Sequence, residues 1–153
     1  MKIRTLARGT AATALAVGLT FGGAGQATAY FSPEQRMYTL AEQPQCGAGF
    51  VDIRVQHGFA RNETRANFTT HLYSPAWSGS ANYECFLTID AAWRNHATGE
   101  SGTVAHQVAS WRFQGPNVAN PYMDIDTGAG PVTVTFSTNT AHAPSPTFEI
   151  PAR

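Results

Sequence analysis

The stretch YECFLTIDAAW, residues 83–93, decides the fold. Its odd-numbered positions carry only apolar side chains and one cysteine, whereas Glu84, Thr88 and Asp90 stand among the even-numbered ones. Apolar residues at every second position are typical of a β-strand, because successive side chains of a strand point to opposite faces. The stretch therefore predicts a long strand whose odd-numbered residues, Tyr83 to Trp93, face a hydrophobic core.

Four other stretches between Gly49 and Ile150 show the same period of two. The residues expected to face inward are Val51, Ile53, Val55, His57 and Phe59; Ala66, Phe68, Thr70 and Leu72; Val132, Val134 and Phe136; and Phe148 with Ile150. Segments rich in Gly, Pro, Ser and Asn separate these runs, as is typical of turns between strands. About seven or eight such strands predict an all-β fold, an antiparallel β-sandwich or a small barrel.

Two segments do not follow this simple pattern. From Thr103 to Phe113 the apolar residues change from even to odd positions, and a β-bulge near Ala109 would produce that change. The best helix candidate is Ser32 to Glu42, where Ser32 could cap a helix and Pro33 could take its first position.

The N-terminal segment has the layout of a cleavable secretory signal. Three basic residues within the first eight precede the apolar run AATALAVGLTF (11–21), which leads to the A-x-A cleavage site ATA (27–29). A run of about 11 residues is too short to cross a bilayer as a helix, which needs roughly 20. We therefore expect a signal peptide over residues 1–29 and a single secreted, extracellular domain over residues 30–153.

The charge of the mature chain excludes some classes of partner. Without residues 1–29 the chain keeps seven of its ten basic residues (10 minus 3) and all ten acids, a net charge of about 3 negative with neutral histidines. A nucleic-acid-binding surface needs clustered positive charge, so no nucleic-acid partner is expected. No second apolar run approaches spanning length, so we expect no membrane span.

The two cysteines of the chain, Cys46 and Cys85, both lie in the mature part. An exported protein meets an oxidising environment in which an even pair of cysteines normally closes. We therefore expect one disulfide, which closes a loop of 39 residues (85 minus 46). The alternative, a catalytic thiol, would need a free cysteine of low pKa.

Ala81-x-Tyr83-x-Cys85 resembles the tyrosine corner of immunoglobulin domains. However, 68 residues follow Cys85 (153 minus 85), and no tryptophan stands shortly after Cys46, so we expect an immunoglobulin-like sandwich of non-standard topology. The general layout is similar to that of small β-sandwich proteins secreted by mycobacteria and related actinobacteria. That resemblance implies a fold class and an extracellular location, and it supplies no site residues.

No motif of the sequence predicts a catalytic residue, a cofactor or a metal site. The histidines are His57, His71, His96, His106 and His142, and no two lie closer than ten residues. Asp124-x-Asp126-x-Gly128 lacks the further ligands of a calcium loop, and it fits a short strand in which Met123 and Ile125 face the core. His57 and His106 are expected to point inward as core histidines.

Aromatic residues provide the best binding candidates. Trp77 stands in the loop between Tyr73 and Tyr83 among small and polar residues, a composition typical of binding loops. His71 and Tyr73 are expected to point outward on one strand and could join Trp77 in a binding surface. The alternatives are a Trp77 that covers the end of the core and an ordinary cross-strand pair at His71.

The sequence thus predicts a secreted, non-enzymatic binding module with an unknown protein or glycan partner outside the cell. One alternative is a small secreted hydrolase that combines His57, His106 and acidic residues from distant positions. The other is an inhibitor of a secreted enzyme, which would present a rigid exposed loop.

Overall fold

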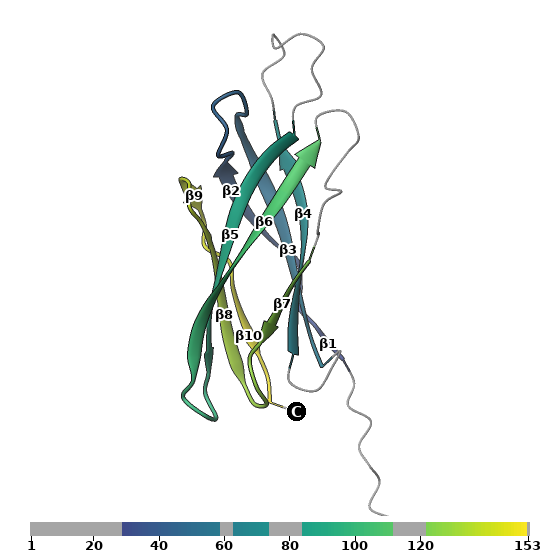
Figure 1. Cartoon of the computed structure of the whole chain (residues 1–153). Coiled ribbons are helices and arrows are strands. Elements are labelled where there is room, and N and C mark those ends of the chain that lie inside the picture. The colour runs from purple at the N-terminus through teal and green to yellow at the C-terminus, as the bar shows by residue number, and fades with distance from the viewer. Residues whose placement is uncertain (1–28, 59–62, 74–83, 112–121, 153) are drawn as a thin grey trace, which may run out of the picture.

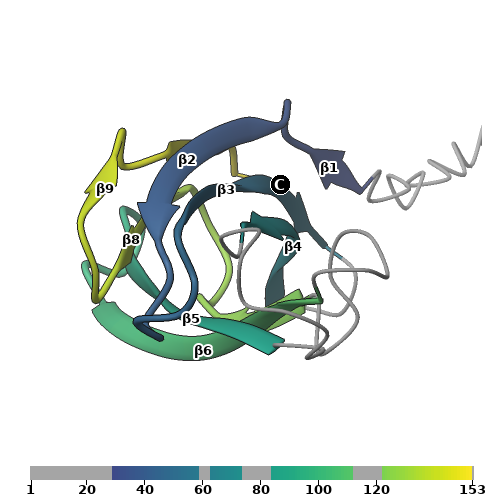
Figure 2. The same ribbon diagram turned by 90° about the horizontal axis from the view of Figure 1, so that it is seen from above.

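The protein is a two-layered all-β structure. The computed structural model describes residues 29–58, 63–73, 84–111 and 122–152. Two antiparallel sheets pack face to face, as Figures 1 and 2 show from two directions, and one disulfide joins them. The expected disulfide-bonded antiparallel sandwich is therefore confirmed. The described residues include no helix that is long and apolar enough to cross a membrane.

The first sheet has the strand order β7-β4-β3-β2-β9, and β1 pairs with β3 beyond the start of β2. Its strands are β1 (Tyr30–Phe31), β2 (Gln35–Leu40), β3 (Ala48–His57), β4 (Glu63–Leu72), β7 (Tyr122–Asp126) and β9 (His142–Ala143). The second sheet has the order β10-β8-β5-β6. Its strands are β5 (Glu84–Asn95), β6 (Ser101–Trp111), β8 (Val132–Thr138) and β10 (Thr147–Ile150). Eight of these ten strands have four or more residues, which agrees with the expected number.

The core lies between the sheets and contains most of the alternating residues expected to face inward, together with Met37 of β2. Trp93 is only partly buried, and Phe59 and Tyr83 lie outside the described residues. Phe68 of the first sheet meets Phe136 of the second edge to face, with ring centroids 5.9 Å apart. Phe136 meets Phe148 in the same way at 5.7 Å. Such edge-to-face pairs add roughly 0.5–1.5 kcal/mol each beyond the burial of their area. This chain of rings fixes the relative position of β4, β8 and β10.

The disulfide between Cys46 and Cys85 joins the β2–β3 connection to β5, with the two Cα atoms 5.9 Å apart. The same connection follows the edge of β5, where Gln43 Oε1 accepts a hydrogen bond of 2.6 Å from the backbone N–H of Phe86. Strand β8 pairs with β5 only from Ile89 onward. The β2–β3 connection therefore takes the place of β8 along the first part of β5.

The helix expected over Ser32 to Glu42 is wrong, because this segment forms β2. Met37 and Thr39 are buried while Tyr38 and Leu40 are exposed, which is the alternation of a strand. Ser32 does not cap a helix, and its hydroxyl instead accepts a hydrogen bond of 2.8 Å from the backbone N–H of Val55. The two exposed apolar residues hid the period of two in the sequence.

The bulge expected near Ala109 is also wrong. The register between β5 and β6 runs without interruption from Glu84 opposite Trp111 to Arg94 opposite Ser101. Val108, Ala109 and Ser110 are all buried, so both faces of β6 are covered at this end of the strand. Val108 and Ala109 are apolar on opposite faces, so the positions of the apolar residues change without an inserted residue, and Phe113 lies outside the described residues.

Candidate functional site

Aromatic side chains gather on the outer face of the first sheet, at the end where β2 and β4 finish. Tyr38 on β2 lies opposite Phe50 on β3, and Phe50 lies opposite His71 on β4. In the next row the backbone N–H of Tyr73 bonds to the carbonyl of Ala48. We call Tyr38, Phe50, His71 and Tyr73 the aromatic cluster.

The rings of the aromatic cluster contact one another around Phe50. His71 stacks on Phe50 with ring centroids 4.5 Å apart and an angle of 27° between the ring planes. Tyr38 meets Phe50 edge to face at 6.2 Å, and Tyr73 lies tilted at 6.5 Å. Each contact is a cross-strand or diagonal pair, the arrangement through which side chains stabilise a sheet surface. The cluster is therefore ordered before any partner binds.

Arg36 covers the second face of Phe50. Its Cζ lies 3.8 Å from the ring centroid, within the range of a cation–π contact. Its Nε and Nη2 donate to the two oxygens of Asp52 at 2.7 and 2.8 Å, and the Asp52 side chain is only 10% exposed. The hydrogen bond to Asp52 raises the pKa of Arg36 further above its ordinary value. A two-point pair of this kind holds the guanidinium in one orientation.

The same combination recurs towards the other end of this face. Arg65 donates to Asp124 at 2.6 and 2.9 Å, and its Cζ lies 4.6 Å from the ring centroid of Tyr122. The hydrogen bond from Arg65 lowers the pKa of Asp124. The face thus carries two ordered groups, each made of an arginine, an aspartate and an aromatic ring.

The aromatic cluster leaves large apolar surface in contact with solvent. Tyr38 is 57% exposed, Tyr73 61% and the neighbouring Leu40 46%, three of the five large exposed hydrophobic residues in the described part of the chain. A shallow hollow of about 380 Å³ adjoins them, and Ala141 and Ala143 form part of its largely apolar lining. The ordered rings and the hollow together form a continuous apolar surface.

Two of the three sequence-based binding candidates lie in this cluster. His71 and Tyr73 point outward as expected, and His71 forms a cross-strand pair with Phe50. Trp77 lies outside the described residues. Tyr38 and Phe50 are not among the residues that the sequence predicts for a site, because the sequence favours a helix over the segment of Tyr38 and because Phe50 stands between the inward-facing positions of β3. A strand assignment for Gln35–Leu40 would have placed Tyr38 on the exposed face, and the register with β3 then sets it opposite Phe50.

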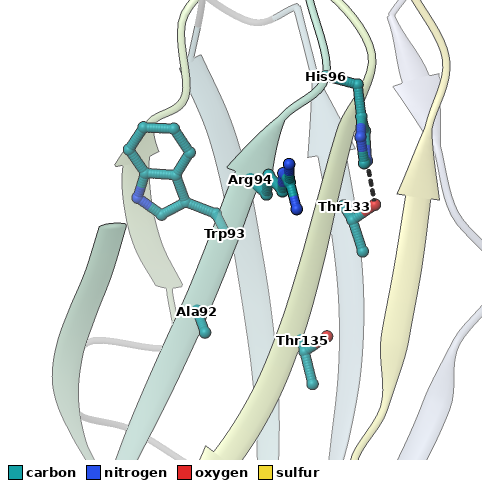
Figure 3. A pocket seen from close by; sticks show the side chains of 6 residues that line it. All are labelled: Ala92, Trp93, Arg94, His96, Thr133 and Thr135. Carbon is teal, nitrogen blue, oxygen red and sulfur yellow. Dashed lines mark hydrogen bonds between the residues drawn. The ribbon is translucent and has the colours of Figure 1, made fainter. Parts of the chain in front are cut away.

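Figure 3 shows a second hollow, of about 300 Å³, over β5 and β8. His96 Nε2 lies 2.6 Å from the hydroxyl of Thr133, and this hydroxyl donates to Glu149 at 2.8 Å. Because the hydroxyl gives its single proton to the carboxylate, His96 is the donor to Thr133. His96 therefore cannot accept the Thr133 proton as the base of an activated nucleophile would. Trp93 is also one of the residues that line this hollow, and in this view its ring points away from Arg94 and His96.

A third, polar hollow of about 250 Å³ lies on the first sheet and brings two carboxylates, Glu34 and Asp52, to one place. Each is bound to an arginine, Asp52 to Arg36 at 2.7 Å and Glu34 to Arg54 at 3.3 Å. A glycosidase acid needs apolar surroundings that keep its proton in place. Neither carboxylate has such surroundings, so the pair fits an ion-paired sheet surface better than an active site.

The two inward-pointing histidines lie between the sheets as expected. His57 is buried, and its Nδ1 lies 2.9 Å from the hydroxyl of Thr64. His106 stacks near Phe68 with ring centroids 6.3 Å apart. Neither lines any of the three hollows. In the described part of the chain, no group of three or more His, Cys, Asp or Glu residues could hold a metal ion.

The fold and the site define a disulfide-bonded antiparallel β-sandwich with an exposed aromatic cluster on one outer face. Comparisons of the chain with protein-family models, with curated proteins and with solved structures found no match.

Proposed function

We propose that this protein is an exported binding module that recognises a protein partner through the aromatic cluster. The observation that carries the proposal is the exposure of Tyr38 and Tyr73 on an ordered group of rings. Contiguous exposed apolar surface on a soluble domain marks an interaction site more often than it is incidental. Catalysis has less support, because the carboxylates and histidines of the hollows are engaged in ion pairs and hydrogen bonds.

The composition of the surface matches that of a protein-binding hot spot. Tyrosine and arginine are enriched among residues that dominate binding energy, and a tyrosine loses little conformational freedom when it is buried. Arg36 is already fixed by Asp52, and Phe50 is already fixed between Arg36 and His71. A partner would therefore bind without ordering these side chains first.

A protein partner fits this surface better than a glycan. Arg36 and His71 occupy the two faces of Phe50, so the central ring is closed to stacking by a sugar. The nearest charged groups, Arg36 and Asp52, are hydrogen-bonded to each other rather than directed at a ligand. The adjoining apolar hollow beside Leu40 instead suits an apolar side chain of a protein.

Export is part of the proposal and rests on the N-terminal signal together with the disulfide. Cleavage after Ala29 would leave every described strand in the mature chain, since the first begins at Tyr30. A formed disulfide fits an oxidising location outside the cytoplasm. We propose that the protein is one of the small β-sandwich proteins secreted by mycobacteria and related actinobacteria.

The test begins with the secreted chain purified from culture medium and immobilised. Proteins captured from the cell envelope and the medium are identified, purified and titrated by calorimetry against the wild type and three variants. Tyr38→Ala and Tyr73→Ala should each weaken binding by about 30-fold, which corresponds to about 2 kcal/mol. Tyr122→Ala is the matched control, because Tyr122 is an exposed tyrosine on the same sheet outside the cluster, and it should change affinity by less than threefold.

Five results would contradict parts of the proposal. If all three tyrosine variants bind as tightly as the wild type, the interaction lies elsewhere on the protein. If only a further variant, Trp77→Ala, loses affinity, the interaction lies in the 74–83 segment. Binding to a glycan array that Tyr38→Ala abolishes would keep the site and replace the partner class. Turnover of a substrate by the purified chain would favour the hydrolase. A captured enzyme whose activity falls on binding would favour an inhibitor.

A further inference from the structure

Among the described strands, every edge strand but one has features that hinder pairing with another chain. An edge strand exposes unpaired N–H and C=O groups, and natural proteins block them with charges, prolines or very short strands. Strand β7 carries Asp124 and Asp126, and β9 has only two residues and is followed by Pro144. Strand β10 carries Glu149 and ends before Pro151.

Strand β6 is the exception. It is an edge strand of eleven residues, SGTVAHQVASW (101–111), with no charged residue and no proline. Its pairing with β5 contains no bulge. Val104 and His106 face inward yet are only half-buried, and no described strand pairs with β6 on the side away from β5. Near the C-terminal end of β6, Ser110 accepts a hydrogen bond from the backbone N–H of Leu72 on β4 of the other sheet. Residues 108–110 are buried, whereas none of residues 101–107 is, so residues 101–107 form the exposed part of this edge.

We propose that residues 101–107 of β6 pair antiparallel with the same residues of a second copy about a two-fold axis. The two four-stranded sheets would then form one sheet of eight strands. Such a closed, self-complementary interface is the commonest way in which identical chains associate. Seven paired residues extend about 23 Å at 3.3 Å each, longer than a typical strand of five or six residues.

A second copy suits this edge because of its charge and side chains. Like charges directly opposite each other destabilise paired strands, and a self-paired β6 has no charges to oppose. The outward-facing residues Thr103, Ala105 and Gln107 are small or flexible and exposed, so they can lie beside their copies. The net negative charge of the mature chain is spread over other strands and is screened beyond about 8 Å at physiological salt.

A single strand pair makes a small interface, so we expect a weak dimer with a roughly micromolar dissociation constant. Sedimentation velocity of the secreted chain between about 1 μM and 1 mM should show a monomer that becomes a dimer as concentration rises. The double variant Thr103→Lys/Gln107→Lys places two lysines on the edge, and we expect it to weaken the dimer by at least 30-fold. Thr133→Lys/Thr135→Lys is the matched control, because β8 is an inner strand of the same sheet, and it should leave the dimer unchanged.

Hydrogen exchange supplies a second readout that does not depend on the variants. Backbone amides of residues 101–107 that point away from β5 should exchange more slowly as the protein concentration rises. A monomer at every concentration would overturn the proposal, as would a dimer that the lysines on β6 leave intact. A dimer that Tyr38→Ala disrupts would place self-association on the aromatic cluster instead. Because β6 and the cluster lie on different sheets, the dimer can fail while the proposed partner binding holds.

Discussion

Removal of the disulfide should destabilise the protein mainly through the unfolded chain. The double variant Cys46→Ala/Cys85→Ala opens a loop of 39 residues. In the chain-entropy model, 2.1 plus 1.5R ln 39 amounts to about 13 cal/mol/K, or about 4 kcal/mol at 25 °C. Both cysteines are buried, so the loss of two sulfur atoms from the core should add about 1 kcal/mol.

The folded state should survive this change, because other contacts hold the same connection to β5. Gln43 accepts a hydrogen bond from the N–H of Phe86, and the Glu42 carboxylate accepts one from the N–H of Thr88. The backbone N–H of Glu42 also donates to the carbonyl of Phe86 at 3.1 Å. Chemical reduction of the wild type should therefore leave the sheets intact and cost about 4 kcal/mol, slightly less than the double variant.

Urea unfolding followed by tryptophan fluorescence measures both values. With a urea m-value of about 2 kcal/mol/M, a loss of 4 kcal/mol lowers the midpoint by about 2 M. The reducing agent should have no effect on the double variant, which serves as the control. A loss below about 1 kcal/mol in both reduced wild type and double variant would refute the reasoning. It would mean that the unfolded chain is not constrained by the bond, or that the bond is not formed in the secreted protein.

Three further predictions concern single positions. Gly49→Ala should cost roughly 1–3 kcal/mol in a thermal or urea unfolding experiment, because its Cβ would lie against the carbonyl oxygen of His71 and 2.7 Å from the Cα of Leu72. Asp124→Asn should lose about 0.2–1 kcal/mol at pH 7, the range of exposed pairs. Arg65 lowers the pKa of Asp124, so this contribution is present above the ordinary carboxyl pKa and disappears as the pH falls through the lower folded value. Urea midpoints of wild type and variant should therefore converge at the low pH where Asp124 is protonated. Intact-mass measurement of the secreted protein should give a chain that begins at Tyr30, and a mass that still includes residues 1–29 would contradict the signal assignment.

The inward-facing residues could be predicted because burial imposes a strict period on the sequence. Leu87, Ile89 and Ala91 are all fully buried on β5, and the same holds for Val132, Val134 and Phe136 on β8. A one-residue shift would expose every one of these side chains, so the pattern is well defined. The pairing of the two cysteines could be predicted for a different reason, since a chain with two cysteines allows only one pairing.

The outer faces could not be predicted in the same way, because no burial constraint acts on them. Tyr38 and Leu40 are apolar and exposed, and they made β2 resemble a helix that begins at Ser32 and Pro33. The cluster around Phe50 depends on the register of β2, β3 and β4, which the sequence does not specify without the pairing itself. His71 and Tyr73 could be predicted as outward-facing because they alternate with the buried residues Phe68, Thr70 and Leu72.

The aromatic cluster and the open edge of β6 occupy different parts of the molecule, and this separation has a functional consequence. In Figure 1 the cluster lies at the end where β2 and β4 finish, whereas residues 101–107 lie towards the opposite end, where β6 begins. A dimer through β6 would therefore leave both aromatic clusters free. Two linked binding sites can raise apparent affinity for a repeated or surface-bound partner by about 10²- to 10⁴-fold without any new contact, provided that both sites can be engaged at once. A weak dimer would then suit a module whose partner is dense on a surface, because binding of two neighbouring partner molecules would itself stabilise the dimer.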